Sequence, residues 1–234
     1  MSLGLGLLVI GGALAVIIGW LINRITTQES FLWTGLVVGG VAFLLAGILQ
    51  NLMVAPVAIT IHGREGLQPL VVGSALEALY YGIAAGIAQE LAKLAGIRVY
   101  GRNHPIIPTA IAIGAGFALT EIILVSVPAV QGSPVALSAL AIPVWERFSA
   151  ILFHTGSAAI IGYGLVRGKM WLYLLIAIVL HAIPDSAVGL MGYYKINQIY
   201  AFETINLIYS AIVLRVAIRW LQSMVREHEP LVTR

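Results

Sequence analysis

The chain contains no cysteine and few charged residues. Among its 234 residues only 10% are charged, whereas 60% are hydrophobic. A chain without cysteine has no disulfide bonds, thiolate nucleophiles or cysteine-based zinc sites, so a metal ion would need histidine and carboxylate ligands. Because a soluble domain carries about 25% charged residues, the composition excludes a water-soluble globule. Most side chains are therefore expected to contact the lipid bilayer.

The basic residues are scattered in short segments rather than gathered with aromatic residues on one face. The high isoelectric point, about 9.3, could have indicated a nucleic-acid partner. Nucleic-acid binding requires a clustered basic surface, which this sequence does not show. We therefore expect no nucleic-acid partner and attribute the positive charges to orientation in a membrane.

Long apolar runs recur along the chain. A helix needs about 20 apolar residues to cross the hydrocarbon core of a bilayer. The sequence predicts one all-α domain over residues 1–234, a polytopic bundle of about seven transmembrane helices with a catalytic core at about 70–195 and a cytoplasmic tail at 222–234. The predicted spans are 3–23, 32–54, 70–97, 106–127, 143–165, 171–190 and 199–221.

The distribution of lysine and arginine predicts the orientation of the bundle. One side holds only Arg64 and Lys195. The other side holds Arg24, Arg98, Arg102, Arg167, Lys169, Arg215, Arg219, Arg226 and Arg234. Since positive charge is retained on the cytoplasmic side, we expect a multi-pass protein of the cell membrane with its N-terminus outside and its C-terminus inside.

Ionisable residues lie within four consecutive predicted spans, the third to the sixth. A charged group within a span costs about 2.5 to 3.5 kcal/mol on insertion scales, so each requires a structural or functional reason. The residues are Glu77, Glu90, Lys93, Glu121, Glu146, Arg147, His154, His181 and Asp185.

Four of these residues are predicted to lie at one depth. In antiparallel helices joined by a tight turn, residues equidistant from the turn lie at the same level. The midpoints between Glu90 and Glu121, Glu121 and His154, and His154 and His181 fall in or at the end of three successive loops. The four side chains are therefore expected to converge inside the membrane.

Helical spacing also predicts which way some of these side chains face. Ser74, Ala78, Gly82 and Gly86 lead to Glu90 in steps of four and form a stripe of small residues. Such stripes allow close packing of helices in lipid. Glu90 is therefore expected to point into the bundle.

The sixth span is interrupted by a proline. Pro184 removes the hydrogen bond to the Leu180 carbonyl and is expected to kink the helix that carries His181 and Asp185. Backbone groups that lack their helical hydrogen bonds are tolerated at this depth only beside protein or a water-filled cavity.

Two kinds of hydrolytic chemistry fit such a cluster. A zinc ion bound by His154, His181 and Glu121 would lower the pKa of a bound water to about 7, and a nearby glutamate would take its proton. Alternatively, a carboxylate would act as general base without metal, with the imidazoles stabilising an oxyanion. The sequence does not separate the two.

The ordered motifs resemble a known family. They are Gln89-Glu90-Leu91-Ala92-Lys93, then Gly114-Ala115-Gly116-Phe117-Ala118-Leu119-Thr120-Glu121, then Glu146-Arg147 with Phe153-His154, then His181-Ala182-Ile183-Pro184-Asp185. Together they resemble the PrsW and YhfC-like intramembrane proteases, in a superfamily with CAAX prenyl endopeptidases and bacteriocin-immunity proteins, and look closest to YhfC. The resemblance covers about residues 75–190.

The resemblance implies a protease that cuts a membrane-associated protein or peptide. Glu90 matches the glutamate that activates water, while His154 and His181 match the histidines that bind metal or the transition state. Glu121 and Asp185 match accompanying polar positions. The chain departs from the family by having glutamine, not glutamate, immediately before Glu90.

Other roles are open for the neighbouring residues. Lys93 is expected to support the site, to pair with Glu90 or to snorkel to the surface. Arg147, with Glu146, is expected to position substrate or to tie helices together. Glu77 and Glu203 are predicted to be interfacial and apart from the site, and no role is predicted for His62, His104 and His228, which are expected to be solvated.

Two alternatives to a protease remain at this stage. Intramembrane carboxylates, histidines and a proline-broken helix also mark ion-coupled or proton-coupled transporters. A non-catalytic member of the family could instead bind a partner helix.

Overall fold

The computed structural model describes residues 3–27, 29–63, 72–130 and 141–228, and these contain helices but no strands. The first long helix is continuous through α1 (Leu3–Gly6), the π-helical turn η1 (Leu7–Gly11) and α2 (Gly12–Thr26). The others are α3 (Trp33–His62), α4 (Ala75–Tyr100), α5 (Ile106–Val130), α6 (Ala141–Val166), α7 (Met170–Tyr193) and α8 (Ile199–His228).

Each long helix overlaps one predicted span, so the all-helical bundle is confirmed. Two helices end well past their predicted spans, which were 32–54 and 199–221. Helix α3 continues past Pro56 to His62. The proline removes only one backbone N–H donor, and the helix does not end there. Helix α8 continues to His228, so residues 222–228 of the predicted tail are helical, whereas 229–234 lie outside the described residues.

Within the described ranges, six helices are long and apolar enough to cross a membrane, which makes this a multi-pass membrane protein. They are the α1–α2 helix, α3, α5, α6, α7 and α8. Helix α4 does not reach this apolar composition, since it carries Glu77, Glu90 and Lys93. The orientation of the bundle stays a prediction, and two residues that entered it, Arg64 and Arg234, lie outside the described residues.

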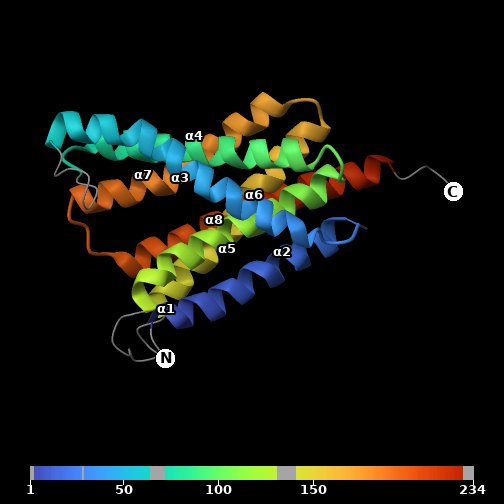
Figure 1. Ribbon diagram of the computed structural model, residues 1–234, viewed down its shortest axis with the longest axis horizontal. Helices are drawn as coiled ribbons and strands as arrows, with labels where there is room; N and C mark the ends of the chain where they lie inside the picture. Colours follow the sequence, from blue (N-terminus) through green and yellow to red (C-terminus); the bar gives the residue numbers. More distant parts are fainter. Residues whose placement is uncertain (1–2, 28, 64–71, 131–140, 229–234) are drawn as a thin grey trace.

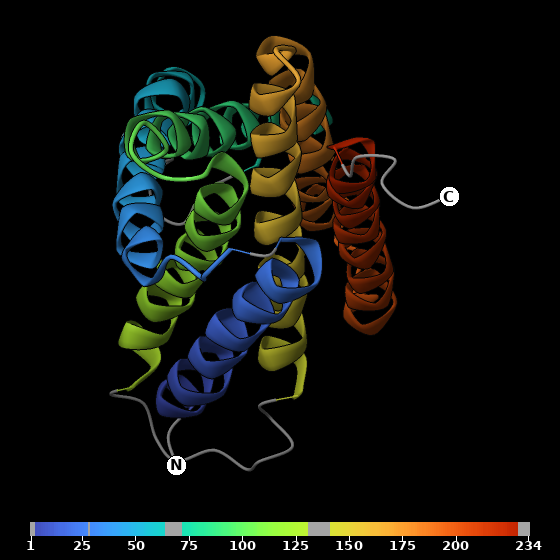
Figure 2. The ribbon, with the colours of Figure 1, turned by 90° about the vertical axis from the view of Figure 1, so that its right-hand side faces the viewer.

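Helices α5 and α6 form the centre of the bundle. Their apolar spans are 67% and 83% buried, compared with 22% for both α3 and α8. Helix α4 packs against α7 and α3, and α6 packs against α8 and α5 (Figure 1). Figure 2 shows α3 and α8 at opposite edges, so their outer faces are free to contact lipid.

The predicted small-residue stripe brings α4 against α7. A Cβ atom at Gly82 would lie 2.2 Å from Ser186 Oγ, and one at Gly86 would lie 2.8 Å from the Ile178 carbonyl oxygen. Only glycine permits backbones to approach this closely. The stripe is confirmed, and the contact brings Glu90 on α4 toward His181 on α7.

Glycine also sets the distance between α5 and α6. A Cβ atom at Gly114 would lie 2.6 Å from the carbonyl oxygen of His154. The same close approach places Glu121, two turns further along α5, beside the His154 side chain.

Candidate functional site

Glu90 is the centre of a buried polar network that joins α4, α6 and α7. Its Oε1 atom lies 2.5 Å from His181 Nδ1 and 2.6 Å from Lys93 Nζ. Ser157 Oγ donates to the same oxygen at 3.2 Å and accepts from Lys93 Nζ at 2.8 Å. The network therefore fixes three helices relative to one another.

Lys93 is wholly buried, with a side-chain exposure of 0%. Its ammonium group lies 4.8 Å from the ring centroid of Phe117 and 5.8 Å from that of Phe153. Ring faces attract a cation, and this adds to the attraction of the Glu90 carboxylate. The predicted pairing with Glu90 is confirmed, and the predicted snorkelling of Lys93 to the surface is wrong.

Glu121 joins α5 to α6 through both of its carboxylate oxygens. Oε2 lies 2.9 Å from His154 Nε2, and Oε1 accepts a hydrogen bond from Arg147 Nη1 at 2.9 Å. Arg147 also pairs with Glu146 through Nη2. Of the two roles predicted for Arg147, tying helices together is thus visible in its contacts.

The two histidines face one another. The ring centroids of His154 and His181 lie 5.3 Å apart. A carboxylate holds one ring nitrogen of each histidine, Glu121 for His154 and Glu90 for His181. The predicted convergence of these four residues is confirmed. Asp185 lies further away, with Oδ2 3.7 Å from His181 Nε2, beyond hydrogen-bonding distance.

Glu90, His154 and His181 form a group that can hold a metal ion. One donor atom from each lies within 4.8 Å of the others. Glu90 Oε2 and His154 Nδ1 are buried and have no hydrogen-bond partner among the described residues. Donor atoms around a tetrahedral zinc ion lie about 3.4 Å apart, given zinc–ligand distances of about 2.1 Å, so small side-chain movements suffice.

The acidic member of this group differs from the one that the sequence predicts. The predicted set contained Glu121, but both oxygens of Glu121 are engaged by Arg147 and His154. Glu90 retains a free oxygen beside the histidines. The carboxylate that completes the structural group is therefore Glu90.

A cavity of about 180 Å³ adjoins the two histidines. Residues of α5, α6, α7 and α8 line it, and α4 contributes Gln89, whereas Glu90 is not part of the wall. The polar lining residues are Gln89, Glu121, Glu146, Arg147, His154, His181, Asp185, Glu203, Asn206 and Ser210. A polar cavity of this size holds several water molecules.

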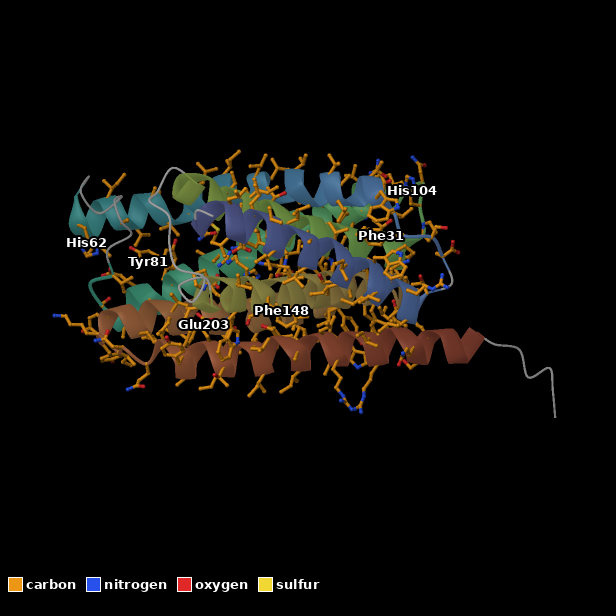
Figure 3. The ribbon with its side chains drawn as sticks, turned by 90° about the horizontal axis from the view of Figure 1, so that it is seen from below. Phe31, His62, Tyr81, His104, Phe148 and Glu203 are labelled. Atoms are coloured by element: carbon orange, nitrogen blue, oxygen red, sulfur yellow. The ribbon has the colours of Figure 1, made fainter. Side chains whose placement is uncertain are left out.

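Helix α8 supplies a wall of the cavity that was not predicted from the sequence. Glu203 was predicted to be interfacial and apart from the site. Its separation from the site is wrong, because it is only 4% exposed and lines the cavity. In Figure 3 it lies on the side of α8 that faces the bundle. The spacing of Glu203, Asn206 and Ser210, which places them on one helical face, is the signal that could have revealed this.

His62 and Glu77 form a polar pair away from this cavity. His62, predicted to be solvated, is instead 2.7 Å from the buried Glu77, between the end of α3 and the start of α4. That prediction is wrong. Figure 3 shows His62 and His104 toward opposite ends of the bundle. Glu77 lies apart from the cavity, as predicted, and the side chain of His228 lies outside the described residues.

Comparisons with protein-family models, with curated proteins and with solved structures found no match for this chain. The resemblance to the PrsW and YhfC-like proteases therefore rests on the sequence motifs alone and stays a prediction.

Proposed function

We propose that this protein is an intramembrane endopeptidase that hydrolyses a peptide bond of a membrane-associated protein or peptide in the cell membrane. One observation carries the proposal: two buried histidines, each held by a carboxylate on one ring nitrogen, face each other beside a polar cavity. A carboxylate that holds one nitrogen fixes the tautomer and orientation of the ring, as in metal sites and acid–base sites. Such groups are costly inside a membrane, which favours a functional role.

Zinc is the metal that we propose for this site. Imidazole nitrogen and carboxylate oxygen are zinc ligands, and the chain has no cysteine. His154, His181 and the free Oε2 of Glu90 would hold the ion. When bound, zinc supplies a Lewis acid that polarises a carbonyl and acidifies water.

Asp185 is the residue that we propose as general base. It lines the cavity, and its nearest ion-pair contact, with His181, is 3.7 Å long. Glu121 is unsuited, because Arg147 and His154 occupy its oxygens. Glu90 was predicted to activate water, but it lies outside the cavity wall and serves better as a ligand.

In the proposed reaction, the oxygen of one water molecule forms a bond to the scissile carbonyl carbon. Asp185 takes a proton from that water and delivers it to the amide nitrogen as the carbon–nitrogen bond breaks. The products are a carboxylic acid and an amine, and Asp185 returns to its carboxylate form. His154 and His181 stabilise the negative charge that develops on the carbonyl oxygen.

Purified protein incubated with membrane-spanning test peptides tests the proposal. Cleavage is followed by mass spectrometry for the natural chain, Asp185→Asn and His154→Ala. We expect the natural chain to cleave the peptides. In Asp185→Asn the rate of cleavage should fall by about 100-fold or more while zinc stays bound. In His154→Ala both cleavage and zinc binding should be lost. Equal cleavage by all three would contradict the proposed site.

The cavity also fits a second function, ion-coupled or proton-coupled transport. Asp185 and Glu203 both line it without a lysine or arginine partner among the described residues, beside a helix that contains Pro184. Titratable groups beside a proline-containing helix occur in carriers. Proteoliposomes that show flux dependent on pH or potential, with no cleavage of any peptide, would favour the carrier.

A further inference from the structure

Helix α8 changes character along the face that it turns toward the bundle. Further along the chain this face carries Val213, Ala217 and Leu221, which belong to an apolar core cluster. Nearer its N-terminal end the same face carries Glu203, Asn206 and Ser210, which line the cavity. Half of α8 therefore anchors the helix, and the other half presents polar groups to the cavity.

Two of these residues are buried and each has a polar side-chain atom without a hydrogen-bond partner among the described residues. Glu203 is 4% exposed and Ser210 is 1% exposed. Neither Glu203 Oε2 nor Ser210 Oγ has a hydrogen-bond partner in the part of the chain that the structure describes. A buried polar atom without a partner costs about 1 to 3 kcal/mol, so these atoms are suited to contact a ligand in the cavity.

The charges around the cavity favour a cationic ligand. Four acidic side chains line it, Glu121, Glu146, Asp185 and Glu203, against a single arginine, Arg147. Arg147 forms ion pairs with Glu121 and Glu146. Since Asp185 is assigned to proton transfer, Glu203 is the buried carboxylate left to pair with a cation from outside.

Helices α7 and α8 both border the cavity. These two helices follow one another in the chain but pack against different partners, α7 against α4 and α8 against α6. Cavity-lining residues come from both, and Val188 of α7 is at the same time 56% exposed. A membrane-embedded segment that approaches along Val188 would reach the cavity from the lipid side.

The length of the polar face suits an extended peptide. Ser210 lies seven positions after Glu203, a rise of about 10 Å along a helix. An extended chain covers this distance with about three residues. Peptide backbone in a membrane needs partners for its N–H and C=O groups, and Asn206 and Ser210 offer both donors and acceptors.

We infer that Glu203 binds a lysine or arginine side chain of a membrane-embedded peptide segment that enters between α7 and α8. A carboxylate and a basic side chain form a charge-assisted hydrogen bond, which is strong where water is excluded. The inference rests on the proposed protease function, and it assigns to Glu203 the choice of substrate rather than a part in the chemistry.

Binding to a turnover-deficient chain tests the inference. The probes are leucine- and alanine-rich membrane-spanning peptides with one central Lys, Gln or Glu, labelled for fluorescence and mixed with Asp185→Asn protein in lipid vesicles. We expect the Lys peptide to bind about tenfold more tightly than the Gln peptide. Adding Glu203→Gln should abolish this preference, and Glu203→Lys should transfer it to the Glu peptide.

Two controls separate recognition from folding. Glu29→Gln removes an exposed acid outside the cavity and should leave the preference for the Lys peptide intact. Glu203→Gln removes an unpaired buried charge, so its melting temperature should be unchanged or higher. The inference would be overturned if the Glu203→Gln protein preferred the Lys peptide over the Gln peptide as strongly as the protein with Glu203 does. It would also be overturned if Glu203 bound potassium ions but showed no preference for the Lys peptide.

Cleavage measured in parallel distinguishes the inference from the proposed function. If the Lys peptide binds through Glu203 but is never cut by the natural chain, the recognition site stands and the protease proposal fails. If peptides are cut, but the ratio of Lys to Gln cleavage is unaffected by Glu203→Gln, the protease proposal stands and the recognition site fails.

Discussion

Tyr209 of α8 donates a hydrogen bond of 2.7 Å to the carbonyl oxygen of Leu180 on α7. This carbonyl lies four residues before Pro184, which has no N–H to offer it. The sequence indicates that Pro184 leaves the Leu180 carbonyl free, and the structure supplies its partner from another helix. One hydrogen bond thus compensates for the proline beside His181 and connects α7 to α8.

A double-mutant cycle at Tyr209 and Pro184 tests this compensation. Tyr209→Phe should lower the free energy of unfolding by about 1 kcal/mol in the natural background. In a Pro184→Ala background the backbone N–H of residue 184 can bond to the Leu180 carbonyl. Tyr209→Phe should therefore lower the free energy of unfolding by less in that background. The measurement is thermal or denaturant unfolding in detergent micelles, and an identical cost in both backgrounds would show that the two residues are not coupled.

The Glu90–Lys93 pair predicts an asymmetric response to substitution. Glu90→Gln leaves a buried ammonium group without its anion, which should destabilise the protein by about 3 to 5 kcal/mol. Glu90→Gln combined with Lys93→Met removes both charges and should recover most of that stability. Unfolding of the single and double variants in the same detergent checks this, and a double variant as unstable as Glu90→Gln alone would contradict it.

Glu121 should support the metal site without being a ligand. Glu121→Gln removes the carboxylate that orients His154, so zinc affinity should fall by about 10-fold to 100-fold. His154→Ala and His181→Ala should each abolish stoichiometric zinc, and His104→Ala should change nothing. Metal content after titration with a zinc buffer gives the result, and Glu121→Gln with unchanged affinity would argue that His154 is held by other means.

The contact between α5 and α6 depends on Gly114. A Cβ atom there would meet backbone and Cβ atoms of α6 at 2.6 to 2.8 Å, so Gly114→Ala must separate the two helices. We expect a loss of about 1 to 3 kcal/mol in stability, together with weaker zinc binding as Glu121 and His154 move apart.

Gly47→Ala is the matched control for that substitution. It lies within α3, and a Cβ atom at Gly47 would meet nothing within 4 Å. Alanine should therefore be neutral or stabilising by up to about 1 kcal/mol. If Gly47→Ala and Gly114→Ala were equally harmful, the close approach of α5 and α6 would not be the cause.

Helix number and residue depth could be predicted from the sequence, because a bilayer requires long apolar runs and short loops place residues at equal levels. The convergence of Glu90, Glu121, His154 and His181 follows from these two facts. Depth does not determine how each helix is rotated or which helices are neighbours. Spacing alone therefore could not choose between Glu90 and Glu121 as the acid beside the histidines.

The residues that were placed wrongly share this cause. Glu203 is near the start of α8, where polar residues usually face the membrane surface, and only the rotation of α8 turns it inward. His62 was assigned to a loop because the predicted span ended at residue 54. The helix continues to His62 and brings it to Glu77.

The wholly buried Glu90 and Lys93 have a consequence for how the protein is made. Helix α4 carries both charges, which pair with each other, whereas an unpaired charge within a span costs about 2.5 to 3.5 kcal/mol on insertion scales. Their partners Ser157 and His181 lie on α6 and α7, which the ribosome synthesises later. Stable insertion of α4 must therefore await the second half of the chain, and a nascent protein cut short before α7 would leave α4 poorly retained in the bilayer.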